Sequence, residues 1–353
     1  MPNKLLTTIF IFLVSITQYS CVPNNKSKRI TVASSGKIES LDPARANTLK
    51  SLQLLSSLGD TLYELNDKGE LVPELASEMP IFSKDKLKII INLRRNVFFH
   101  DGTPFNSNAM KFSFDRFRKI GTMNYILGNK IKSIEAPSKY QLIINLNKPS
   151  SSVNGLLTSV NLTPISPNFY KDYSDKFLND KFVGTGKYKL KRFSNEIQVL
   201  EVNSNYWGEK PLNEGITFVG YSNSSSLFGA LKSKQVDVLL SNSIDDSQRN
   251  SLRLLSENKQ IKEGISPDTE ISFISLRTNK YPLNNQKLRL ALAKSLNRKL
   301  ISEKVSYGLR KASRSVIPPI FKKGYQDLWP NYDYSEARKL LVEENYCNGN
   351  ILK

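Results

Sequence analysis

The side chains that most often perform catalysis or bind metals are scarce in this sequence. The 353 residues include one histidine, His100, and two cysteines, Cys21 and Cys347. A Ser-His-Asp or Cys-His site would have to use His100. A zinc site needs several His, Cys or carboxylate side chains at ligand spacing. We interpret His100 as a turn residue, and one histidine with two remote cysteines cannot form a conventional zinc site, so we expect no enzyme activity, no metal and no cofactor.

Two other motifs could be mistaken for chemistry. The stretch 184–187 reads GTGK, but a phosphate-binding P-loop also needs a glycine at position 181 and Ser or Thr at position 188. The sequence has Lys181 and Tyr188 there. The carboxylate pairs Asp245-Asp246 and Glu343-Glu344 are sequence neighbours that face different ways on a helix or loop. We interpret both pairs as solvated surface.

The N-terminus has the pattern of an export signal. Lys4 precedes an apolar run over residues 5–16, and Ser20 and Cys21 follow. A run of about a dozen apolar residues is short for a membrane span and fits the core of a signal peptide. We predict a signal peptide over residues 1–21 and lipid attachment at Cys21, although Gln18 departs from the usual leucine. A plain secretory signal is the alternative.

The charge balance limits the classes of partner. The chain has 51 basic and 32 acidic residues, for a net charge of +19. A basic chain with aromatic residues raises the question of nucleic-acid binding. The lysines and arginines are scattered, however, and no zinc finger, helix-turn-helix or RNP-like motif is present. We therefore expect a solvated basic surface and no nucleic acid.

The clearest structural pattern lies between Leu87 and Arg116. Alternating apolar residues over 87–93 predict a strand with one buried face. A turn follows at His100-Asp101-Gly102. A helix then begins near Asn106 or Ser107 and carries Met110, Phe114 and Phe117 on one face. We interpret His100 as a residue of this turn.

Periodicity and turn residues predict the remaining elements. They are a strand from Ile30, a helix with Leu49, Leu52, Leu55, Leu58 and Leu62 on one face, a strand over Leu142–Leu146, a short helix over Phe169–Phe177, a strand within 195–207, a strand, helix and strand within 216–240, a strand over Ile271–Leu276, a helix from Asn285 with Leu288, Leu292, Leu296 and Leu300 on one face, and a helix from Asp333 with a capping box to Glu336.

Short motifs along the chain resemble family 5 of the bacterial extracellular solute-binding proteins. These proteins are receptors that deliver peptides, nickel or other solutes to ABC importers. The motifs, in the order of the family, are SLDP at 40–43, GELVPELA at 69–76, HDGTPF at 100–105, GTGKY at 184–188, NYWG at 205–208, LKSKQVD at 231–237 and LRLALA at 288–293. Lys187 and Lys234 replace a proline and a glycine of the family pattern.

The resemblance implies an α/β, periplasmic-binding-protein-like fold with two lobes of mixed sheets flanked by helices. Lobe I would comprise residues 22–45 and 180–264, with 46–179 forming an inserted subdomain. Residues 265–353 would begin lobe II. The stretch YCNG at 346–349 resembles a Y-P-N-G motif of the family. Family members continue beyond this motif, so we expect this chain to be C-terminally truncated and its second lobe to be incomplete.

The resemblance also implies a receptor for oligopeptides or dipeptides that captures its ligand between two lobes. Its partners would be a peptide or other small solute, the membrane subunits of an ABC importer and, through the lipid, the membrane surface of the cell envelope or periplasm. The SLDP motif would lie at the mouth of the ligand cleft. The ligand-binding candidates are Ser35, Gly36, Ile38, Glu39, Tyr125, Arg277 and Asn279. Alternatives are a non-functional truncated remnant, an envelope interaction protein that keeps the fold, or a receptor for a nickel chelate or oligosaccharide.

Overall fold

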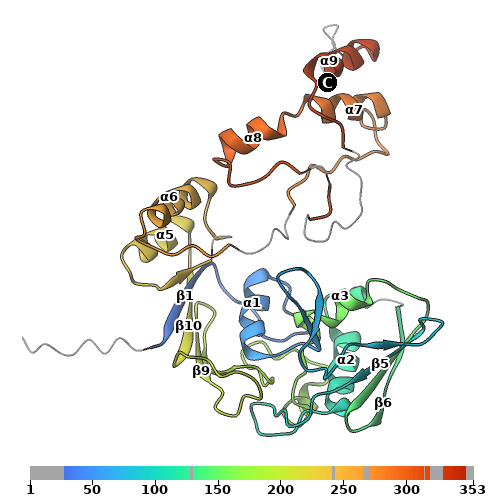
Figure 1. Ribbon diagram of the computed structural model, residues 1–353, viewed down its shortest axis with the longest axis vertical. Coiled ribbons are helices and arrows are strands. Elements are labelled where there is room, and N and C mark those ends of the chain that lie inside the picture. The colour runs from blue at the N-terminus through green and yellow to red at the C-terminus, as the bar shows by residue number, and fades with distance from the viewer. Residues whose placement is uncertain are drawn as a thin grey trace, which may run out of the picture.

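The computed structural model describes residues 28–127, 130–240, 243–265, 271–313, 315–318 and 329–346. The predicted signal peptide, Cys21 and Cys347 lie outside these ranges. Two sheets with their helices occupy the lower part of the view in Figure 1, and the helices at the C-terminal end of the described chain lie above them. Within the described ranges, no helix combines the length and the apolar content that crossing a membrane requires.

The larger sheet joins the start of the chain to residues some two hundred positions later. Its five strands lie in the order β11-β1-β10-β9-β8. β1 pairs in parallel with β10 and β11, whereas β9 pairs antiparallel with β10 and β8. The strands are β1 (Ile30–Ser35), β8 (Tyr188–Phe193), β9 (Ile197–Val202), β10 (Gly215–Tyr221) and β11 (Val238–Leu239).

Two helices cover opposite faces of this sheet, because successive side chains of a strand point to opposite sides. Val32 of β1 packs in the core formed with α1 (Leu49–Leu58), whose Leu54, Leu55 and Leu58 are buried. The next residue, Ala33, packs instead with Leu227 and Ala230 of α5 (Ser224–Lys232). The chain therefore leaves β1 toward one face and leaves β10 toward the other.

The smaller sheet forms a second core with one helix. It is antiparallel, with the order β4-β5-β7-β6. Its face packs against α2 (Ser107–Ile120), which buries Met110, Phe114 and Phe117 as the sequence predicted. Asn106 caps the helix by accepting a hydrogen bond from the Ala109 N–H. The strands are β4 (Ile81–Phe82), β5 (Lys88–Asn92), β6 (Ile131–Ser138) and β7 (Gln141–Leu146).

The remaining elements up to residue 257 lie between or after the strands of the two sheets. A hairpin of β2 (Tyr63–Leu65) and β3 (Leu71–Pro73) follows α1. The others are η1 (Asn124–Ile126), α3 (Val153–Leu157), η3 (Val160–Leu162), α4 (Pro167–Tyr170), η4 (Lys171–Tyr173) and α6 (Asp246–Glu257). The helix predicted over Phe169–Phe177 is therefore only partly correct, since helical structure ends at Tyr173.

Three further helices lie in the described part of the chain after residue 271. They are α7 (Gln286–Ser295), α8 (Arg298–Val305) and α9 (Tyr334–Glu343). The single helix predicted to carry Leu288 through Leu300 is wrong. Leu296 has an extended backbone, and the side chain of Asn297 accepts from the Leu300 N–H, which starts a new helix. Asp333 caps α9 as expected by accepting from the Glu336 N–H.

The strand predicted over Ile271–Leu276 does not form. These residues have no assigned secondary structure, and Phe273 and Ile274 are exposed. An apolar segment becomes a strand only when another strand supplies its hydrogen bonds. Within the described ranges no such pairing reaches this segment. The local pattern was correct for a strand, but the pairing depends on another part of a chain.

Candidate functional site

The carboxyl edge of the five-stranded sheet is a topological switch point. The neighbouring parallel strands β1 and β10 end there at Ser35 and Tyr221. From these ends the chain passes to α1 on one face of the sheet and to α5 on the other. A crevice opens where connections diverge in this way, and open α/β sheets bind their ligands there. This edge is our candidate functional site.

The loop after β1 is shaped by Gly36. Its φ is +74°, a left-handed conformation that glycine adopts without strain. The Gly36 N–H donates to the carbonyl of Tyr221 at 2.5 Å, which joins the ends of the two strands. A Cβ atom at position 36 would collide with the ammonium of Lys50, from the first turn of α1. Glycine therefore leaves the space that the Lys50 side chain fills.

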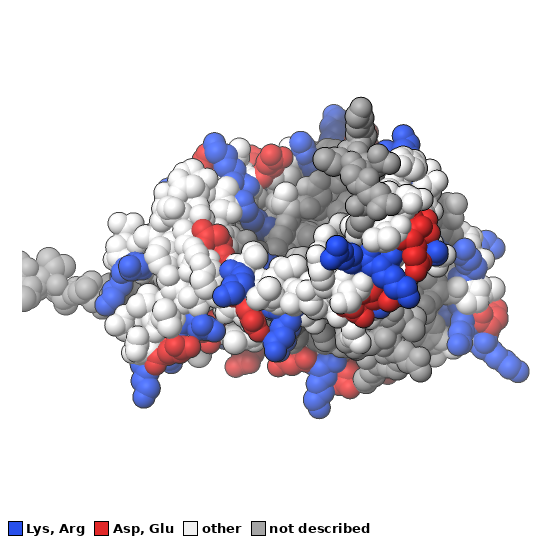
Figure 2. Space-filling model, turned by 90° about the horizontal axis from the view of Figure 1, so that it is seen from above, with Lys and Arg blue, Asp and Glu red and all other residues white. Residues whose placement is uncertain are grey.

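Two lysines at this edge differ in whether they form an ion pair. Lys37 forms an exposed ion pair with Glu196 at 2.7 Å, and this hydrogen bond and charge raise the pKa of Lys37. Lys50 is half-buried, and burial lowers its pKa. Among the described residues, no ion pair includes Lys50. Over the face shown in Figure 2, basic and acidic side chains are interspersed and form no continuous basic surface.

Four of the predicted ligand-binding residues lie in this loop, but they are not equivalent. Ser35 and Gly36 are half-buried and Glu39 is exposed. The Ile38 side chain is only 4% exposed and belongs to the core between α1 and the sheet. Its N–H donates to the carbonyl of Asn195. The Ile38 side chain is therefore part of the core, and its assignment as a ligand-binding residue stays a prediction.

The other three predicted residues lie apart from the loop. Tyr125 is in η1 and is 70% exposed, and Arg277 and Asn279 follow the unpaired segment after residue 270. Within the described ranges, no hydrogen bond or ion pair connects these three residues to the Ser35–Glu39 loop. The structure thus brings four of the seven candidates together and leaves three separate.

The SLDP motif is structural. Asp42 is fully buried, and its two carboxylate oxygens accept from Arg116 of α2 at 2.8 and 2.6 Å. The same carboxylate accepts from the N–H groups of Ala44 and Leu178. The expectation that this motif lies at the mouth of a cleft is corrected for Leu41 and Asp42, which are interior. The partner Arg116 is 74 positions away, and no spacing rule pointed to it.

The opposite, amino edge of the sheet holds a buried polar network around Asp60. Its carboxylate accepts from Thr185 at 2.8 Å, Tyr206 at 3.1 Å and the Trp207 indole at 2.9 Å. Burial raises the pKa of Asp60, while these hydrogen bonds and the charge of Lys187 oppose the rise. The network explains why the motifs around 185 and 206 lie together.

The two glycines of the GTG motif allow this segment to pack closely against the end of α1. A Cβ at Gly184 would meet the Leu58 carbonyl and the ring of Phe182, and a Cβ at Gly186 would meet the backbone of Leu58 and Gly59. The segment can therefore lie directly against the end of α1. Thr185 between the glycines then reaches Asp60. Sequence reasoning found the motif but not this reason for it.

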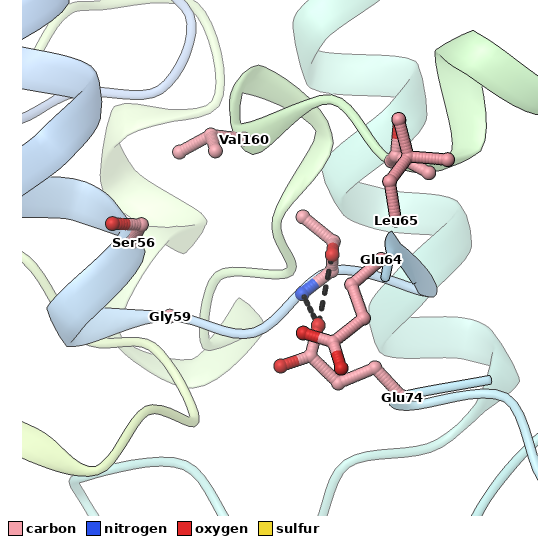
Figure 3. A pocket seen from close by; sticks show the side chains of 8 residues that line it. Ser56, Gly59, Glu64, Leu65, Glu74 and Val160 are labelled. Atoms are coloured by element: carbon pink, nitrogen blue, oxygen red, sulfur yellow. Dashed lines mark hydrogen bonds between the residues drawn. The ribbon is translucent and has the colours of Figure 1, made fainter. Parts of the chain in front are cut away.

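A cavity of about 260 Å³ lies beside this network. It is lined by Ser56, Gly59, Thr61, Glu64, Leu65, Glu74, Thr158 and Val160. Figure 3 shows the carboxylates of Glu64 and Glu74 side by side, with Glu74 accepting from the N–H and hydroxyl of Thr61. Burial, followed by the negative charge of Asp60, raises the pKa of Glu74 to about 7. The cavity contains acidic and hydroxyl groups but no cationic side chain.

His100 lies in the turn where the sequence placed it. Its Nε2 is 3.1 Å from the carbonyl of Gly186, so Nε2 carries a proton and donates. Its backbone N–H donates to the carbonyl of Gly184. Burial lowers the pKa of His100 to about 4, which keeps the ring neutral near pH 7. In the part of the chain that the structure describes, no three His, Cys, Asp or Glu side chains gather as a metal-binding group.

Comparisons with known proteins agree with this geometry. The family model described as bacterial extracellular solute-binding proteins, family 5 Middle, matches residues 70–353. The glutathione-binding protein GsiB of Salmonella choleraesuis is 28% identical over 334 residues, which cover 93% of this chain and 63% of GsiB. The chain thus spans less than two thirds of the length of this relative.

Solved structures are also similar. The periplasmic binding protein DppA of Helicobacter pylori, in complex with the peptide STSA, gives a TM-score of 0.74 at 25% identity and covers 91% of this chain and 68% of DppA. NikA of Brucella suis, in complex with Fe(III)-EDTA, gives 0.79 at 22% identity and covers 90% of this chain and 64% of NikA. These likenesses confirm the expected α/β fold class with mixed sheets flanked by helices.

Proposed function

Because the chain belongs to the bacterial extracellular solute-binding proteins of family 5, we propose that it is a receptor that captures a small solute for an ABC importer. The observation that carries the proposal is the switch point at the carboxyl ends of β1 and β10. There a loop with a left-handed glycine and half-buried polar groups opens onto the place where such sheets bind ligands. The named relatives are binding proteins, and the one histidine that a Ser-His-Asp or Cys-His site could use, His100, lies in a turn with its Nε2 donating to the Gly186 carbonyl.

The proposed ligand is a short peptide. GsiB is named for binding glutathione, and the DppA structure holds the peptide STSA. Both ligands are short peptides with free carboxylates. In this chain, Ser35, Gly36 and Glu39 would contact the ligand from one side. Arg277 and Asn279 would contact it from the other side, once the two lobes close by a hinge motion.

The proposed lobes follow the sheets. Residues 22–45 and 180–264 would form lobe I, which is supported by the pairing of β1 with β10 and β11 across about two hundred residues. Residues 46–179 would form the inserted subdomain with its own four-stranded sheet. Residues 265–353 would belong to lobe II, and Tyr125 would belong to the inserted subdomain.

The proposed location is the cell envelope, with Cys21 carrying a lipid. The support is the sequence pattern alone, namely the apolar run over 5–16 followed by Ser20 and Cys21. Intact mass spectrometry of membrane-extracted protein tests this step. A mass equal to a chain that begins at Cys21 plus a lipid is expected, and Cys21→Ser should release the protein from the membrane fraction. An unmodified mass would reject the lipid anchor without affecting the receptor proposal.

Titration calorimetry of the full native chain tests the receptor proposal. Saturable binding of glutathione, dipeptides or tetrapeptides is expected, with a melting temperature that rises with the logarithm of ligand concentration once the ligand exceeds its Kd. Nickel-histidine and an oligosaccharide are included as probes of other solute classes. Saturable binding of one of these alone would replace the peptide as ligand. If none of the probes binds, the receptor proposal is rejected.

A further inference from the structure

Lys50 is placed at the candidate site by two parts of the chain. It is the second residue of α1, and Thr48 fixes the start of that helix by accepting from the Ser51 N–H. Its side chain reaches back to Gly36, where its ammonium occupies the space that a Cβ would need. The ammonium therefore lies against the loop that ends β1, at the carboxyl edge of the sheet.

In the described part of the chain, no carboxylate pairs with the charge of Lys50. None of the ion pairs among the described residues involves it, and no acceptor is recorded for its ammonium within those residues. Its neighbour Lys37 is more exposed and is paired with Glu196. The buried Arg116 is matched by Asp42. The Lys50 nitrogen is not among the enclosed polar atoms that lack a partner, so its ammonium reaches solvent and an anion from outside the chain can pair with it.

We propose that Lys50 binds a carboxylate of the ligand and makes the receptor selective for anionic peptides. This inference rests on the proposed function and deepens it, because it adds a specificity residue and a charge requirement. Gly36 takes part indirectly, since any side chain at that position would displace the ammonium. A carboxylate suits the ammonium because a charge-assisted hydrogen bond is stronger than a neutral one.

The test compares matched ligands that differ in charge. Glutathione is compared with its diethyl ester, and Ala-Ala with its C-terminal amide, by titration calorimetry on the full native chain. The wild type should prefer the acid at least tenfold. Lys50→Gln should weaken binding of the acid at least tenfold and change binding of the ester or amide less than twofold. Lys50→Arg should keep most of the preference, because it keeps the charge.

Lys37→Gln is the matched control. It removes a positive charge from the loop next to Lys50, but that charge is already paired with Glu196, so the affinity for the acid should change less than twofold. Equal affinity of the wild type for acid and ester would overturn the role of Lys50 and leave the receptor proposal intact. An equal loss for both ligand forms in Lys50→Gln would show a structural role and also overturn it. Absence of binding for every probe rejects the receptor proposal itself, and this inference with it.

Discussion

The two edges of the five-stranded sheet differ in whether their charged side chains have partners within the described residues. At the amino edge, Asp60 is buried and accepts hydrogen bonds from Thr185, Tyr206 and Trp207. At the carboxyl edge, Lys50 is half-buried and takes part in no ion pair among the described residues. Buried polar groups that hold a fold together are normally satisfied within it. The contrast therefore separates a structural polar network from a polar group that is available to a ligand.

The strongest test of this comparison is at the Asp42–Arg116 pair, the most deeply buried internally matched charge. Asp42→Ala leaves the Arg116 guanidinium buried without its carboxylate. We expect a loss of about 3–5 kcal/mol in the free energy of unfolding, measured by urea denaturation. Asp115→Ala serves as control, because Asp115 pairs with Lys111 and Arg118 at the surface. That variant should lose less than about 1 kcal/mol. Equal losses would mean that burial does not distinguish the two pairs.

The next largest effect concerns Glu74 and pH. The pKa of Glu74 is raised from an ordinary 4.5 to about 7, chiefly by burial. Between these two pH values the native state holds a proton that the unfolded state has lost, so stability falls as pH rises through this window. The contribution amounts to roughly 3 kcal/mol, present below pH 4.5 and lost above pH 7.

Glu74→Gln removes this titration and keeps an acceptor for the Thr61 N–H. We expect the variant to gain stability relative to the wild type as pH rises from 4 to 8, measured by urea denaturation at each pH. Glu70→Gln is the control, because Glu70 is an exposed carboxylate of the same hairpin that accepts from Asn66. A pH profile of Glu74→Gln parallel to that of the wild type would contradict the prediction.

A smaller loss is expected from Trp207→Phe. The change removes the indole N–H that donates to Asp60, and it reduces the ring under the guanidinium of Arg94. Removal of one donor to a buried carboxylate costs about 1–3 kcal/mol. The other tryptophan, Trp329, is 43% exposed, so Trp329→Phe should change thermal stability much less. Equal losses of thermal stability in Trp207→Phe and Trp329→Phe would show that the hydrogen bond from Trp207 to Asp60 does not contribute to stability.

The smallest effect on stability is expected at the carboxyl edge. There the substitution is expected to leave the free energy of unfolding unchanged or to raise it slightly, whereas the substitutions of Asp42 and Trp207 are expected to lower it. Lys50→Gln removes a half-buried charge that forms no ion pair within the described residues. Its free energy of unfolding should stay within about 0.5 kcal/mol of the wild type or rise slightly. Thermal denaturation without ligand measures this, with Lys37→Gln beside it. A loss above 1 kcal/mol would place Lys50 among the structural groups and remove the contrast between the edges.

Local sequence patterns were sufficient to predict elements that bury one face on a single core. The alternation before Asn92 and the apolar spacing of Met110, Phe114 and Phe117 specified β5 and α2, because each pattern reflects one face buried on one core. The helix break at Leu296 was missed although Asn297 is a frequent capping residue. There, regular leucine spacing outweighed a cap signal that was present in the sequence.

Patterns that depend on distant partners could not be predicted in the same way. The segment Ile271–Leu276 alternates like a strand, but a strand also needs a partner. Asp42 and Arg116 are 74 positions apart, and Asp60 meets residues more than 120 positions away. Of the candidate ligand residues, the loop at 35–39 was located through a motif, whereas Lys50 carried no motif at all. Its position became visible only when α1 and Gly36 were seen together.

The anchoring of α1 at one end has a mechanical consequence. The GTG motif lies against its C-terminal end, where Gly184 and Gly186 contact Leu58 and Gly59 and Thr185 donates to Asp60, and its leucines pack on the sheet. Ten residues make a rod about 15 Å long, with Lys50 at the end far from the GTG motif. A helix held in this way has little freedom left to lose when its tip meets a ligand, so the entropy cost of binding falls mainly on the lysine side chain.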